Sequence, residues 1–112
     1  MKRIALLIAV LAALVAVPGT AHAATTCSTP KYPGSGYFTK LQVTHVSCAT
    51  GRKFVVSYYK CRTKHGATGR CASKVSGYRC KETRTSSSVE IDAKVTCTHG
   101  SKKIVHYYQQ NT

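Results

Sequence analysis

Residues 47–62 read SCATGRKFVVSYYKCR, and this stretch decides the fold. Ser47 stands where a helix N-cap belongs, because its hydroxyl can accept from the free amides of a first helical turn. Lys60 and Arg62 give the other end a positive charge, which the helix dipole favours. The stretch therefore predicts a helix over 48–62.

The apolar side chains of this helix fall into two groups when placed about 100° apart. The wider group predicts the face turned to the core, and the second group lies beside it. Arg52 falls within the wider group, which is the one local inconsistency in the helix. The wider group consists of Cys48, Ala49, Val55, Val56 and Tyr59, and the second of Phe54, Tyr58 and Cys61.

Strand-like segments flank the helix on both sides. Apolar and polar residues alternate in one segment before the helix and three after it, and His99-Gly100-Ser101 between the last two is typical of a hairpin connection. The order strand, helix, strand, strand, strand predicts an α+β fold, with one helix packed on a small antiparallel sheet. Residues 24–36 predict an extended arm and 64–73 a polar loop. The strand segments are 37–46, 77–84, 91–98 and 103–109.

The N-terminal residues have the order of a secretory signal. Lys2 and Arg3 precede the apolar run Ile4–Val17, and Ala21-His22-Ala23 forms a small-residue cleavage site. The run is shorter than the ~20 residues that a membrane-spanning helix needs. We therefore expect a cleavable signal peptide over 1–23, no transmembrane anchor, and a single secreted, extracellular domain over 24–112.

Six cysteines lie in the predicted mature domain, and an even number in an exported chain predicts three disulfides. Cys48 and Cys61 would sit roughly 20 Å apart along the helix, too far for a disulfide, which leaves twelve of the fifteen possible pairings. We prefer a Cys61–Cys71 bond that closes the polar loop, and the other pairings stay open. No C-x-x-C pair occurs, so we expect neither a metal nor a cofactor. The six are Cys27, Cys48, Cys61, Cys71, Cys80 and Cys97.

The predicted mature domain is strongly basic. The chain has 17 Lys and Arg against 3 Asp and Glu, and removal of Lys2 and Arg3 leaves 15 against 3, a net charge of +12. Such a charge favours an anionic partner, namely nucleic acid, a wall polymer, lipid head groups or an acidic protein. The alternative is that the charge only keeps a monomeric domain soluble, since the basic residues are scattered along the chain.

One strand face is the candidate polyanion-binding surface. Arg79 and Lys81 lie on one side of their strand, and Lys94 joins them if its apolar neighbours point inward. Nearby aromatic rings would allow bases to stack beside the bound phosphates. We therefore expect a non-enzymatic protein that binds anionic polymers or surfaces. The candidate rings are Tyr32, Tyr37, Tyr107 and Tyr108.

A structural ion pair is predicted between the helix and the sheet. Tyr78, Cys80 and Glu82 share a strand face, and a disulfide at Cys80 would turn that face inward. An Arg52–Glu82 pair would then neutralise two misplaced charges. The alternative is that Arg52 extends to the helix edge and keeps its charged end in water.

Two other functions stay open. A ribonuclease-like enzyme would use His45 and His106 as acid and base. A protease inhibitor would present Lys64 or Arg70 on the Cys61–Cys71 loop, although the glycines in that loop argue against rigidity. The hydrolase motifs G-x-S-x-G and H-E-x-x-H do not occur.

Three segments carry a family resemblance: 46–52 with its SCATxR helix start, 77–82 with GYxC, and 91–111 with VTC-x-x-G and a YQQN end. The chain resembles a group of uncharacterised small secreted proteins from actinobacteria over most of residues 24–112. The resemblance implies export and this architecture, and it assigns no catalytic residue. Gly51 departs from the group's pattern, where a helix former such as Ala is expected, so the first helical turn is less secure.

Overall fold

The computed structural model describes residues 23–112. The predicted signal peptide, 1–23, thus lies outside the described residues except for Ala23. One helix and five strands follow, so the α+β fold is confirmed, and the sequence missed only the short first strand within the predicted arm. The elements are β1 (Thr25–Cys27), β2 (Gly36–Thr44), α1 (Cys48–Arg62), β3 (Arg79–Ser86), β4 (Glu90–His99) and β5 (Lys102–Asn111).

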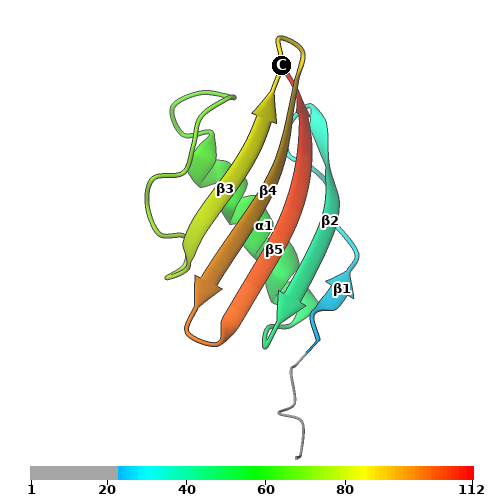
Figure 1. Ribbon diagram of the computed structural model, residues 1–112, viewed down its shortest axis with the longest axis vertical. Coiled ribbons are helices and arrows are strands. Elements are labelled where there is room, and N and C mark those ends of the chain that lie inside the picture. The colour runs from blue at the N-terminus through cyan, green and yellow to red at the C-terminus, as the bar shows by residue number, and fades with distance from the viewer. Residues whose placement is uncertain (1–22) are drawn as a thin grey trace, which may run out of the picture.

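The five strands form one antiparallel sheet in the order β1-β2-β5-β4-β3. Gly100, with a φ of 57°, makes the tight turn between β4 and β5, a conformation that favours glycine. Helix α1 crosses behind the sheet in Figure 1. No element of residues 23–112 covers the near face, which is therefore open to solvent.

Helix α1 begins and ends where the sequence predicts. Ser47 is the N-cap, and its hydroxyl accepts a 3.1 Å hydrogen bond from the amide of Thr50. The amide of Thr63 closes the other end by donating to the carbonyl of Tyr59 over 2.9 Å. Within the described residues no helix is long and apolar enough to cross a membrane.

The face that α1 buries differs from the predicted one. Phe54 and Tyr58 of the second group are buried together with Val55, whereas Val56 and Tyr59 of the wider group are only partly buried. The cause is Gly51, because a Cβ there would lie 2.7 Å from Cγ1 of Val43. Glycine therefore lets the first turn approach β2 closely and turns the second apolar group toward the sheet.

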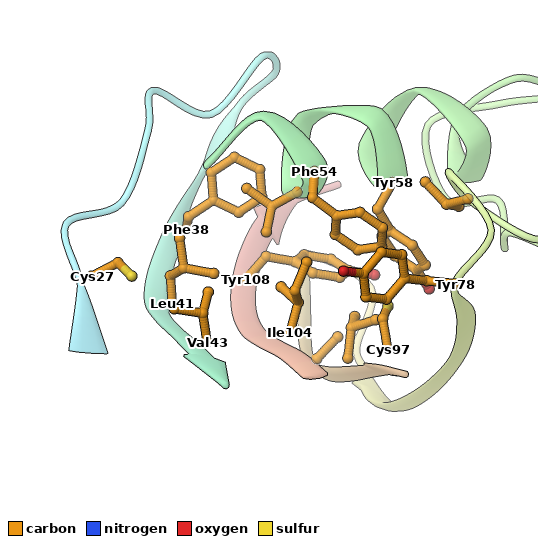
Figure 2. Packing of buried hydrophobic residues seen from close by; sticks show 14 of the residues in the cluster. Cys27, Phe38, Leu41, Val43, Phe54, Tyr58, Tyr78, Cys97, Ile104 and Tyr108 are labelled. Atoms are coloured by element: carbon orange, nitrogen blue, oxygen red, sulfur yellow. The ribbon is translucent and has the colours of Figure 1, made fainter. Parts of the chain in front are cut away.

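The core lies between α1 and the covered face of the sheet. Figure 2 shows Phe54 and Tyr58 of the helix packed above the inward side chains of the central strands. Tyr78, which precedes β3, closes one side with its ring 4.8 Å from that of Phe54. Buried and more exposed side chains alternate strictly along β4 and β5, as expected of strands with one buried face, and the buried ones form the floor of the core. The floor includes Ile91, Ala93, Val95, Cys97, Ile104 and Tyr108.

Three disulfides hold this small domain together. Cys61–Cys71 is confirmed, with its Cα atoms 5.2 Å apart. Cys27–Cys48 joins β1 to the start of α1, and Cys80–Cys97 joins facing positions of β3 and β4. None of the six cysteines is free. Three disulfides fit an oxidising extracellular environment.

Candidate polyanion-binding surface

The uncovered face of the sheet carries its side chains in rows that cross four strands. The register aligns β2, β5, β4 and β3, and every second residue of each strand points to this face. A bulge between Phe38 and Lys40 changes the alternation in β2, so that Phe38 is buried while Lys40 points outward. The three rows are Lys40-Tyr107-Lys94-Thr83, Gln42-Val105-Thr96-Lys81 and Thr44-Lys103-Thr98-Arg79.

These rows bring five exposed cations onto one surface, which we call the basic face: Lys40, Arg79, Lys81, Lys94 and Lys103. The sequence predicted three of the five. Lys40 and Lys103 were missed because their placement depends on the bulge in β2 and on the pairing of β5. Each precedes a buried residue, Leu41 or Ile104, and that alternation was the available signal.

An aromatic ring lies within the basic face, between two of its cations in the register. The ammonium groups of Lys40 and Lys94 lie 5.9 and 5.7 Å from the ring centroid of Tyr107, within the range of cation–π attraction. Tyr37, whose exposed fraction is 66%, lies one row away, opposite Gln109. Two of the four candidate tyrosines are therefore on this surface.

The other two candidate tyrosines do not belong to the surface. Tyr32 and Tyr108 are buried beneath the helix, with exposed fractions of 6% and 2%. Desolvation raises the pKa of Tyr32 to about 12, partly offset by Arg62, so its hydroxyl stays protonated. Both rings serve the core, because β5 alternates and Tyr108 points to the face opposite that of Tyr107.

All three carboxylates of the chain lie off the cationic rows. Glu82 is on the covered face, with 5% of its side chain exposed. Asp92 and Glu90 are on the uncovered face but at one end, where Asp92 pairs with Gln109 in the register. The three cationic rows themselves therefore contain no carboxylate, and Asp92 lies one row beyond the row of Lys94.

The predicted Arg52–Glu82 pair is wrong. Arg52 donates to the hydroxyl of Ser28 over 3.3 Å, beside β1. Glu82 lies on β3, at the opposite edge of the sheet, and pairs with Arg84 at 2.7 Å. Arg52 belongs to the first turn of α1, and this turn approaches the β1–β2 edge because Gly51 packs on Val43.

Glu82 is the centre of a buried polar network. Its Oε1 accepts from the hydroxyls of Tyr58 at 3.1 Å and Tyr108 at 2.8 Å, and its Oε2 accepts from Nε of Arg84 at 2.7 Å. Burial, reinforced by the carboxylate, raises the pKa of both phenols, so each stays a donor. The exposed Arg70 adds a longer contact of 3.5 Å. The inward-facing carboxylate of Glu82 is therefore satisfied by Arg84 and two tyrosines and not, as the sequence predicts, by Arg52.

Arg62 forms the second buried polar cluster and has an exposed fraction of only 1%. It donates to the hydroxyl of Tyr32 at 2.9 Å and to Oε1 of Gln110, 2.6 Å away. Its other amino group donates to the carbonyl of Ala67 at 3.0 Å, so the cluster also holds the disulfide loop. The guanidinium carbon lies 4.5 Å from the ring centroid of Tyr108.

The Cys61–Cys71 loop is thus held more firmly than its glycines suggested. Arg84 donates to the carbonyls of Thr68 and Gly69 at 2.8 and 2.9 Å. Lys64 is exposed, and Arg70 keeps 61% of its side chain exposed despite its contact with Glu82. These two candidate inhibitor residues therefore project from a fixed loop.

The candidate catalytic histidines do not share a solvent-exposed site. His106 has an exposed fraction of 1%, and neither ring nitrogen has a hydrogen-bond partner within residues 23–112. Desolvation, reinforced by Arg62, lowers the pKa of His106 to about 3. His45 is exposed in the turn after β2, with a φ of 56°. A polymer bound at the surface would not contact His106, which packs between Phe38 and Tyr58.

The chain matches no family model, no curated protein and no solved structure.

Proposed function

We propose that this protein is an exported binding protein that engages anionic polymers through its basic face. The observation that carries the proposal is that five exposed cations lie on three neighbouring rows of one sheet face, and no carboxylate lies in these rows. A secreted domain in an oxidising environment is consistent with the three disulfides and with the predicted signal peptide.

The geometry of the basic face favours an extended polymer over a small anion. Neighbouring strands lie about 4.8 Å apart, and successive outward residues of one strand about 7 Å, so the cations spread over a surface instead of converging on a point. Tyr107, between Lys40 and Lys94, and Tyr37, one row beyond them, offer aromatic surface beside the charges. A single-stranded nucleic acid, with both phosphates and bases, is the polymer that uses both features.

Salt dependence tests the proposal. Three to five phosphate contacts predict a log–log slope of about −2 to −3.5 for single strands, so the affinity should fall roughly 20- to 100-fold between about 50 and 200 mM salt. Fluorescence anisotropy with a labelled oligothymidine strand measures this slope. The double variant Lys81→Glu/Lys94→Glu should bind at least about tenfold more weakly and reduce the slope by about 1.4, the share of two contacts.

A control of equal net charge separates the basic face from charge in general. Lys31 and Lys64 are exposed and lie outside the strands that form the face. Lys31→Glu/Lys64→Glu should therefore keep most of the affinity. Equal losses in the two double variants would contradict the proposal, because binding would then follow net charge and not a particular surface.

A further inference from the structure

Besides the basic face, the protein has a cationic groove on the outer side of α1. It has a volume of about 470 Å³ and is lined by Pro30, Arg52, Lys53, Val56, Ser57 and Lys60. Lys53 and Lys60 are seven residues apart and so lie on the same side of the helix, roughly 10 Å from each other along its axis. Val56 and Ser57 lie between them along the helix and also line the groove.

The charge of this groove is as unopposed as that of the basic face. Helix α1 contains no Asp or Glu, and the chain's three carboxylates lie on the sheet. Within residues 23–112, Arg52 donates a hydrogen bond to the neutral hydroxyl of Ser28, which does not neutralise its charge. The groove therefore presents three cations, complementary to a flexible phosphate backbone.

The helix lies behind the sheet, so the groove and the basic face point in opposite directions (Figure 1). A polymer bound on one surface leaves the other open. We propose that the groove on α1 is a second polyanion-binding site and that one protein molecule bridges two separate segments of a phosphodiester strand. This inference rests on the proposed function, because it requires the basic face to hold the first segment.

Bridging can be measured with two sets of oligothymidine strands of about 20 nucleotides, one carrying a donor dye and one an acceptor dye. The oxidised protein should produce energy transfer that peaks near one protein per two strands. Excess protein should then reduce the transfer, since each strand would be occupied by its own protein molecules.

Two double variants of equal net charge show which surface binds each strand. Lys53→Glu/Lys60→Glu should abolish the energy transfer while its strand affinity, measured by anisotropy, changes less than about threefold, because the basic face is intact. Lys81→Glu/Lys94→Glu should also lose the transfer, and its remaining binding should be weaker.

Failure of the inference can be told apart from failure of the proposed function. Strand binding without energy transfer in the unmodified protein would overturn bridging and leave the basic face as a single site. Energy transfer that survives in Lys53→Glu/Lys60→Glu would also overturn it, since a protein dimer would then be joining the strands. Absence of strand binding by anisotropy would remove the proposed function and the inference together.

Discussion

Replacing Glu82 by Gln should lower the free energy of unfolding by about 3 to 5 kcal/mol, the usual cost of removing one partner of a buried ion pair. Only 5% of the Glu82 side chain and 6% of the Arg84 side chain are exposed. The guanidinium of Arg84 would therefore keep its charge without a counterion and with little access to water.

The amide of Gln lowers the stability further than the loss of the negative charge alone. One side-chain oxygen could still accept from Tyr58 and Tyr108, but the new NH₂ group would face Nε of Arg84, placing a donor against a donor. Arg84 also holds the carbonyls of Thr68 and Gly69, so its displacement would loosen the disulfide loop.

Urea unfolding at pH 7 measures the effect. Asp92→Asn is the matched control, because Asp92 sits exposed on the other face of the sheet and loses the same charge. The control should stay within about 0.5 kcal/mol of the unmodified protein. If Glu82→Gln also stays within that range, the network does not contribute the stability that we assign to it.

The positions of Arg52 and Arg62 in α1 show which parts of the packing can be predicted from the sequence. Local signals placed the helix correctly, since the Ser47 cap and the basic end act within one turn. The burial of Arg62 was not foreseen, because its partners Tyr32 and Gln110 lie 30 and 48 residues away. The sequence predicts Glu82 on β3 as the partner of Arg52, yet Arg52 donates its hydrogen bond to Ser28, beside β1.

The candidate surface was predicted in part for a similar reason. Alternation within single strands sufficed to place Lys81 and Lys94 on the outward face. Lys40 required knowledge of a bulge, and Tyr107 could be told from Tyr108 only once the inward set of β5 was known. The alternation of residues along one strand thus predicts which side chains share a face of the sheet. Which residues of different strands lie side by side can be predicted only when the register of the strand pairs is known.

Acidification should destabilise the protein well before its carboxylates titrate, because His106 is buried without a hydrogen-bond partner in the described part of the chain. Its pKa in the folded state is lowered to about 3, against about 6.5 in the unfolded chain. Below pH 6.5 the unfolded state therefore binds a proton that the folded state does not bind until about pH 3.

The free energy of unfolding should consequently fall as the pH falls through this window. The slope approaches about 1.4 kcal/mol per pH unit, which amounts to roughly 2 kcal/mol between pH 6.5 and 5 and at most about 4 to 5 kcal/mol by pH 3. Well above pH 6.5 the imidazole is neutral in both states and the contribution is constant.

Substituting Phe for His106 should remove most of this dependence. The imidazole ring packs edge-on against Phe38 and Tyr58, with centroids 5.9 and 5.2 Å away, so an aromatic hydrocarbon ring suits the same site. Urea unfolding at pH 7 and pH 5 measures the difference, and the loss of about 2 kcal/mol expected of the unmodified protein should shrink to a few tenths.

His65→Phe serves as the control, since His65 lies exposed in the disulfide loop and its substitution should leave the fall between pH 7 and 5 intact. An equal fall in His106→Phe and in the unmodified protein would show that another group takes up the proton. If the dependence disappears with His106 alone, the buried imidazole is the acid-sensitive element of this core, and the histidine considered for catalysis acts on stability instead.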